Sequence, residues 1–184
     1  MALAAVFLDR DGVIIENRDD HVKSWEEVQF IPGAFEGLKK LSQSSYAIVL
    51  VTNQSVVGRG MITLEQAHAI NDRVIAEIKS HGGRIDASYL CPHHPDAGCA
   101  CRKPRPGLLL QAAQELDLQL TSSYLIGDAL TDIQAAQAAG VKGILVLSGR
   151  GVAQAKLVAQ LKVSDFLRVA DLRAAVDLIL EGRD

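Results

Sequence analysis

The sequence predicts an α/β fold built on a parallel sheet with helices on both faces. Short runs rich in Val, Ile and Leu alternate with longer segments of helical periodicity, which is the βαβ pattern of a parallel sheet. The runs are apolar throughout, so both faces of the sheet should be covered. A chain of 184 residues that is 48% hydrophobic can bury about 70% of its unfolded surface around one core. We therefore expect one domain spanning residues 1–184.

The candidate strands are the apolar runs 4–8, 46–51, 85–90, 124–126 and 143–147, with a weaker run at 166–169. The clearest helix is 64–80, whose apolar residues recur at intervals of three and four. Thr63 and Gln66 form a capping-box pattern before it, and a pair of glycines follows it. Further helices are expected at 34–42, 108–116, 131–139, 153–161 and 172–180.

Three segments show neither periodicity, namely 15–30, 55–62 and 91–106. We expect them to be loops. In a parallel α/β fold, the loops at the carboxyl ends of the strands form the functional site. The search for chemistry therefore concentrates on these segments and on the residues that directly follow each strand.

Composition excludes several classes of partner. The net charge of -3 and the pI near 5.9 leave no general basic field, so nucleic acid is not an expected partner. No stretch is long and apolar enough to span a membrane, and the apolar N-terminus lacks the basic flank of a signal peptide. Three clustered cysteines suit a metal site in a reducing compartment better than disulfides. We expect a cytoplasmic protein with no membrane partner, and a monomer is compatible with the sequence.

The end of the first strand carries two carboxylates. Asp9 and Asp11 follow the run 4–8 directly, and Gly12 provides a tight turn. Carboxylates so close repel each other unless a cation or a proton intervenes, and Mg²⁺ prefers oxygen ligands. A simple polar turn is the alternative. A calcium-binding EF-hand loop is excluded because Ile14 and Asp20 would stand where that loop needs Gly and Glu.

Polar and basic side chains follow the second and third strands. Thr52, Asn53 and Gln54 could donate hydrogen bonds to phosphate oxygens without adding negative charge. Arg102 and Lys103 lie between Cys101 and Pro104, in a segment that its prolines keep rigid. Either residue could neutralise charge on a phosphoryl group. Each feature alone is also typical of an ordinary strand end or a solvated loop.

The fourth apolar run ends at Asp128, and Asp132 lies on the turn that opens the next helix. If Asp128 faces the Asp9 loop, it supplies a further carboxylate for Mg²⁺. An acidic residue in a first helical turn is also favoured by the helix dipole alone. The sequence therefore does not decide whether Asp132 caps the helix or supports the metal site.

The cysteines belong to a second candidate metal site, a loop at residues 91–101. Cys91, His93, Cys99 and Cys101 offer three thiolates and one imidazole, a closed set for tetrahedral structural zinc. His94 competes with His93 for the fourth position. Such a zinc site would brace the loop that presents the basic pair after it. The alternative is a set of free cysteines in an exposed loop.

Four segments in this order, FLDRDGV, VTNQS, RKP and LIGDALTD, resemble the four motifs of the haloacid dehalogenase (HAD) superfamily of phosphohydrolases. The likeness covers nearly the whole chain. It implies a Rossmann-like sheet with helices on both faces and no separate cap domain. It also implies Mg²⁺-dependent hydrolysis of a phosphomonoester through an aspartyl-phosphate intermediate.

The resemblance also implies roles for individual residues. Asp9 would be the nucleophile and Asp11 the general acid and base. Thr52 and Lys103 would hold the phosphoryl group during transfer. Asp9, the backbone carbonyl of Asp11, and Asp128 would bind Mg²⁺.

The zinc loop and the segment VTNQSVVGRGMIT resemble, within that superfamily, the heptose 1,7-bisphosphate 7-phosphatases and the similar histidinol-phosphatase group. A phosphorylated sugar in nucleotide-heptose or lipopolysaccharide precursor synthesis is the implied substrate, and histidinol phosphate is the alternative. Two departures bear on the substrate. The stretch between His94 and Cys99 is short, and Ala129 stands where the heptose enzymes often carry Lys.

Several residues are candidate substrate contacts by the same resemblance. Arg59 and Arg102 could grip a distal phosphate, and Asn53 and Gln54 lie beside the phosphoryl-binding motif. Asp19 and His21 belong to a segment that aligns loosely with a substrate-contacting stretch.

A non-enzymatic alternative is a receiver-like signalling domain that accepts a phosphoryl group on Asp. Receivers share the parallel fold, but their phospho-accepting Asp should follow a later strand, and Asp11 would have no proton to move. A receiver-like domain would also not explain the zinc loop.

Overall fold

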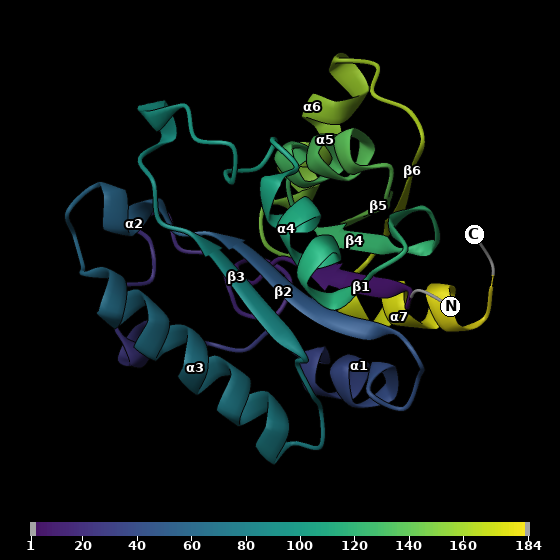
Figure 1. The fold of residues 1–184 in the computed structure, drawn as a ribbon, viewed down its shortest axis with the longest axis horizontal. Helices are drawn as coiled ribbons and strands as arrows, with labels where there is room; N and C mark the ends of the chain where they lie inside the picture. Colours follow the sequence, from purple (N-terminus) through teal and green to yellow (C-terminus); the bar gives the residue numbers. More distant parts are fainter. Residues whose placement is uncertain (1–2, 183–184) are drawn as a thin grey trace.

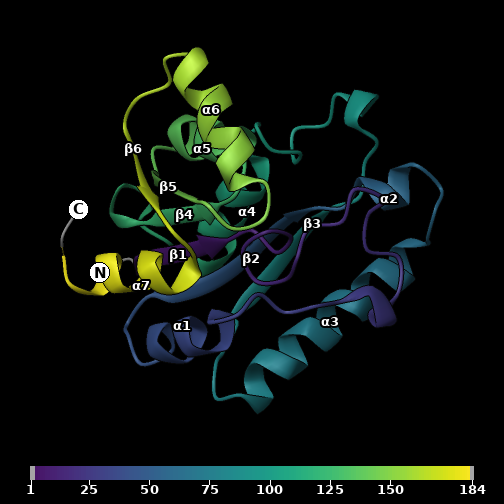
Figure 2. The ribbon, with the colours of Figure 1, turned by 180° about the vertical axis from the view of Figure 1, so that it is seen from behind.

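The computed structural model describes residues 3–182 and contains one six-stranded parallel sheet (Figures 1 and 2). The spatial order of its strands is β3-β2-β1-β4-β5-β6. The strands are β1 (Ala5–Leu8), β2 (Ala47–Asn53), β3 (Ala87–Cys91), β4 (Tyr124–Gly127), β5 (Lys142–Val146) and β6 (Phe166–Val169).

Helices connect the strands. They are α1 (Ala34–Leu41), α2 (Ser55–Gly58), α3 (Leu64–Ser80), α4 (Gly107–Leu116), α5 (Leu130–Ala139), α6 (Gly151–Gln160) and α7 (Leu172–Leu180). Short 3₁₀ turns occupy Trp25–Glu27, Pro95–Ala97 and Leu120–Ser122. The capping box predicted for α3 is confirmed, because Gln66 N donates to Thr63 Oγ1 at 3.2 Å and Thr63 N to Gln66 Oε1 at 2.8 Å.

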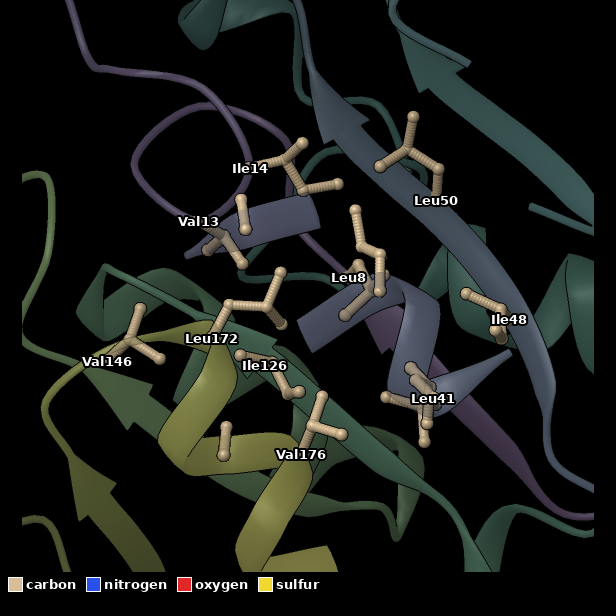
Figure 3. Packing of buried hydrophobic residues seen from close by; sticks show 14 of the residues in the cluster. Leu8, Val13, Ile14, Leu41, Ile48, Leu50, Ile126, Val146, Leu172 and Val176 are labelled. Atoms are coloured by element: carbon tan, nitrogen blue, oxygen red, sulfur yellow. The ribbon is translucent and has the colours of Figure 1, made fainter. Parts of the chain in front are cut away.

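Two apolar layers cover the two faces of the sheet. Alternate residues of a strand point to opposite faces, so Leu8 packs with helices α1, α3 and α7 while Phe7 packs with α4 and α5. Figure 3 shows side chains of the first layer meeting between the sheet and helices α1 and α7. The labelled residues there are Leu8, Val13, Ile14, Leu41, Ile48, Leu50, Ile126, Val146, Leu172 and Val176.

The predicted α/β class, with a parallel sheet and helices on both faces, is confirmed. Two details of the prediction are wrong. The segment 55–62, predicted as a loop, begins with the short helix α2, a single turn that apolar periodicity cannot detect. Full coverage of every strand also fails at the edges, where Ser88 of β3 and Arg168 of β6 are exposed, because an edge strand has a neighbour on one side only.

The strand order brings together loops that are far apart in the sequence. Leu8 at the end of β1 pairs with Leu50 of β2 on one side and with Ile126 of β4 on the other. The strand order reverses at β1, since β2 and β3 lie on one side of it and β4 to β6 on the other. Ligands bind at such a switch point, outside the carboxyl ends of the strands.

Among residues 3–182, no helix has the length and apolar character needed to cross a lipid bilayer.

Candidate functional site

A cavity of about 320 Å³ opens at the carboxyl ends of the strands, where the order of the sheet reverses. Its lining combines acidic, basic and amide side chains from segments that follow β1, β2, β3, β4 and β5. The lining residues are Asp9, Asp11, Asn17, His21, Val22, Asn53, Gln54, Ser55, Arg102, Lys103, Pro104, Ala129, Thr131, Asp132, Arg150 and Gln154.

Three buried carboxylates crowd together at the base of this site. Asp9, Asp128 and Asp132 each offer one oxygen, and these oxygens lie within 4.8 Å of one another. Burial raises the pKa of Asp9 to about 6, against the opposing effect of Lys103. Burial and the charge of Asp9 also raise the pKa of Asp128. Buried acids that repel one another in this way form an oxygen donor set that suits a hard divalent cation such as Mg²⁺.

Lys103 balances part of this negative charge. Its side chain is buried, and Nζ lies 3.0 Å from Asp9 Oδ1 and 2.6 Å from Asp132 Oδ1 and donates to Val51 O at 2.9 Å. Burial alone would lower the pKa of Lys103, but the charges of Asp132 and Asp9 raise it, so the amine stays protonated. Asn53 fixes the backbone of Lys103 through two hydrogen bonds of 3.1 Å. The sequence placed Lys103 in the site but did not predict its pairing with Asp132.

Asp132 makes a helix-cap contact and also a contact inside the site. Its Oδ2 accepts a hydrogen bond of 3.1 Å from Ala129 N, which caps α5, and its Oδ1 pairs with Lys103. One carboxylate therefore fixes both the start of α5 and the position of the buried amine.

Asp11 is held by two neighbours. The buried guanidinium of Arg10 donates from Nε and Nη2 to its two oxygens at 3.2 Å each, and Gln54 Nε2 donates to Oδ2 at 2.8 Å. Gln54 also donates to Thr52 Oγ1 at 2.9 Å. The sequence analysis missed Arg10, although its place between the two aspartates was a visible signal.

Asp128 is fully buried and receives hydrogen bonds from two residues that sequence reasoning missed. Its Oδ2 accepts from Asn17 Nδ2 at 2.5 Å and from the backbone N of Arg150 at 2.8 Å. Gly12 lies against the same carboxylate: a Cβ on it would lie 2.1 Å from Asp128 Oδ2, and its φ of +86° favours glycine. The turn after β1 therefore tolerates no side chain at this position.

Four of the six predicted substrate contacts line the cavity, and these are Asn53, Gln54, Arg102 and His21. Arg59 and Asp19 are exposed and are not among the lining residues. The substrate contacts assigned to these two residues therefore stay predictions without support from the cavity geometry.

The second candidate metal site is a compact Cys/His cluster. The sulfurs of Cys91, Cys99 and Cys101 lie 3.2 to 3.6 Å apart, and His93 Nδ1 lies 3.2 Å from Cys101 Sγ and 3.5 Å from Cys91 Sγ. A zinc tetrahedron with bonds of about 2.3 Å separates its sulfurs by about 3.8 Å, close to this spacing. His94 lies outside the cluster, and its Nδ1 accepts a hydrogen bond from Asp96 N at 3.3 Å. The four residues could therefore hold a metal ion, with His93 as the imidazole.

Comparisons with known proteins show which proteins this chain resembles. A family model described as HAD-hydrolase-like matches residues 100–175. A D-glycero-beta-D-manno-heptose-1,7-bisphosphate 7-phosphatase of Bordetella bronchiseptica is 39% identical over 96% of this chain and 97% of its own length. The same enzyme of Photorhabdus laumondii is 42% identical over 95% of each chain.

A solved structure has the same fold. The crystal structure of D,D-heptose 1,7-bisphosphate phosphatase from B. bronchiseptica, complexed with magnesium and phosphate, superposes with a TM-score of 0.91 and 36% sequence identity. The match covers 98% of this chain and 99% of that one.

Proposed function

Because the chain belongs to the HAD-like hydrolase family of phosphatases, we propose that it hydrolyses D-glycero-D-manno-heptose 1,7-bisphosphate at the 7-phosphate. The observation that carries the chemistry is the buried group of Asp9, Lys103 and Asp128 at the base of a polar cavity. The proposed substrate is supported by the relatives, which match at least 95% of this chain and carry that activity in their names.

We assign the nucleophile to Asp9. Its Oδ1 accepts a hydrogen bond from Arg10 N at 2.8 Å and pairs with Lys103 Nζ at 3.0 Å. These contacts fix the carboxylate at the carboxyl end of β1. An oxygen of Asp9 attacks phosphorus, the bond between phosphorus and the sugar oxygen breaks, and the departing oxygen takes a proton from Asp11. Asp11 then deprotonates a water, which attacks the aspartyl-phosphate and releases inorganic phosphate and free Asp9.

Other residues of the chain stabilise charge during these steps. Lys103 and Thr52 would hold the oxygens of the phosphoryl group, and Gln54 keeps Asp11 directed toward the site. Mg²⁺, held by Asp9, the carbonyl of Asp11 and Asp128, would supply further positive charge next to the phosphoryl group. Splitting hydrolysis into two displacements lets the same fixed charges serve both.

A panel of substrates tests the proposed function. In the presence of Mg²⁺, heptose 1,7-bisphosphate is expected to give a higher kcat/KM than histidinol phosphate, fructose 1,6-bisphosphate or phosphoserine. A higher kcat/KM for histidinol phosphate would overturn the proposed substrate but leave the phosphatase chemistry in place.

Asp11→Asn is expected to lower kcat by about 10²- to 10⁴-fold, the usual contribution of a general acid and base. Loss of the base should slow hydrolysis of the aspartyl-phosphate, so the phosphorylated enzyme should accumulate with a reactive substrate. Mass spectrometry of acid-quenched protein would detect the added phosphoryl group. The double variant Asp9→Asn/Asp11→Asn should not gain it, and a gain there would place the phosphoryl group on another residue.

We propose that the Cys/His cluster binds structural zinc. Its four ligands leave no position for a reacting water, and the cluster directly precedes the loop of Arg102 and Lys103. Zinc would therefore support catalysis by keeping this loop in place.

Metal analysis can separate the two sites. Protein purified without chelator is expected to hold one zinc per chain, and stripping that zinc should lower the melting temperature and then the activity. Removal of Mg²⁺ should stop activity reversibly with little change in melting temperature, because an open oxygen site contributes less to the fold. His93→Ala should lose the zinc, while His94→Ala, outside the cluster, should keep it. Equal zinc content in both variants would contradict the assigned ligand set.

We also propose that residues 1–184 act as one domain without a separate cap, since all six strands described belong to one sheet. The three cysteines form no disulfide, and a cysteine metal site suits a reducing compartment, which supports the cytoplasm as the site of action.

A further inference from the structure

The cavity holds more positive charge than the proposed chemistry uses. Besides Lys103, it is lined by the guanidinium groups of Arg102 and Arg150. Lys103 is buried and committed to Asp9 and Asp132. The side chain of Arg150, by contrast, is 55% exposed, and its guanidinium makes only long contacts of 3.5 Å with Asp128.

Arg150 stands at an unusual place for a cation. It is the N-cap residue of α6, and the amino end of a helix carries partial positive charge, which disfavours a cationic side chain and favours an anion. No side-chain hydrogen bond caps this helix. The local field thus adds to the charge of Arg150, and both attract an anion to this wall of the cavity.

The ion pair with Asp128 does not explain why residue 150 carries a guanidinium group. The Oδ2 of Asp128 already accepts from Asn17 Nδ2 and from the backbone N of Arg150, at 2.5 and 2.8 Å. The guanidinium approaches the same carboxylate no closer than 3.5 Å, which is the limit of a hydrogen bond. Any residue with a backbone N–H at position 150 could make the shorter of these contacts, so the side chain is available for another partner.

We propose that Arg150 is a specificity-determining residue that binds the non-reacting phosphate of a sugar bisphosphate. This inference rests on the proposed function and adds a residue to it. The reacting phosphate belongs beside Asp9 and Lys103, and Arg150 lines the same cavity from the loop after β5. A guanidinium can bind a phosphate through two parallel hydrogen bonds, which fixes the orientation of the sugar between the two phosphates.

The inference departs from what the sequence suggests for Arg59. Arg59 and Arg102 were the sequence-based candidates for the remote phosphate; Arg102 lines the cavity, but Arg59 is exposed and does not. Arg150 carries the same charge and does line it. Assigning the remote phosphate to Arg150 or to Arg59 therefore predicts opposite outcomes for the same measurement.

The test compares kcat/KM for heptose 1,7-bisphosphate with kcat/KM for heptose 7-phosphate in four proteins. These are the wild type, Arg150→Gln, Arg59→Gln and Lys156→Gln, the last an exposed cation of α6 that serves as a matched control. Glutamine keeps the backbone N–H that bonds Asp128. We divide kcat/KM for the bisphosphate by kcat/KM for the 7-phosphate, and we expect Arg150→Gln to lower this ratio by about 10- to 100-fold. Loss of one charge-assisted contact has about this effect. The ratio should stay at its wild-type value in Arg59→Gln and Lys156→Gln, and Arg150→Lys should recover part of it.

A binding measurement adds a readout that does not depend on turnover. In the Asp9→Asn background, calorimetry should show tighter binding of the bisphosphate than of the 7-phosphate, and adding Arg150→Gln should remove the difference. An unchanged ratio in Arg150→Gln, or an equal loss on both substrates, would overturn the inference while leaving the proposed substrate in place. A wild-type enzyme that does not favour the bisphosphate over the 7-phosphate would also overturn the inference, and one that hydrolyses neither heptose phosphate would overturn the proposed function.

Discussion

Asp9→Asn is expected to lower kcat by about four to six orders of magnitude, the size of loss that follows removal of a covalent nucleophile. An amide is a far weaker nucleophile than a carboxylate, and it would also weaken the metal site shared with Asp128. Phosphate release from heptose 1,7-bisphosphate at saturating Mg²⁺ measures the effect. Asp72→Asn, the same change at an exposed position of α3, should leave kcat unchanged.

The same substitution should not destabilise the metal-free protein. Burial raises the pKa of Asp9 to about 6 from its ordinary value of 3.8, so ionisation of Asp9 costs stability as the pH rises through this window. Asparagine cannot ionise, and Lys103 keeps its partner Asp132. At pH 7 the metal-free variant should therefore melt at or above the temperature of the wild type. A folded variant with near-normal turnover would remove Asp9 from the role of nucleophile.

Local patterns predicted the scaffold because the signals that make a strand or helix lie within the segment itself. The bounds of α3, β6 and α7 agree with the runs 64–80, 166–169 and 172–180. The acids Asp9 and Asp128 were also predictable, since the end of an apolar run marks the edge of a parallel sheet where a site forms.

Contacts between distant segments could not be predicted in this way. Asn17 and Asp128 are 111 positions apart, and no periodicity or motif links them. Arg150 follows the fifth strand in the segment SGRG, which carries no motif among those in the sequence. Its approach to the cavity depends on the position of β5 beside β4. For Arg59 the resemblance predicted a substrate contact, but sequence similarity alone does not say whether a loop residue faces the cavity, and Arg59 does not line it.

Lys103→Met is expected to have the largest combined effect on stability and activity. Methionine matches the length of the lysine stem but leaves Asp9 and Asp132 buried without their cation. Breaking a buried ion pair by removing one partner costs about 3 to 5 kcal/mol. At about 2 to 4 °C per kcal/mol, the melting temperature should fall by about 6 to 20 °C. Loss of a charge that stabilises the transferring phosphoryl group should also lower kcat by about 10²- to 10³-fold. Lys156→Met, at an exposed site, is the control.

A second substitution separates the two effects of Lys103. Asp132→Asn keeps an acceptor for Ala129 N but removes one of the two carboxylates that Lys103 neutralises. The double variant Lys103→Met/Asp132→Asn should therefore recover part of the lost melting temperature and none of the lost kcat. If the double variant melts no higher than Lys103→Met at pH 8, the uncompensated charge of Asp132 is not the cause of the instability. Packing of the lysine stem would then be the stabilising contribution.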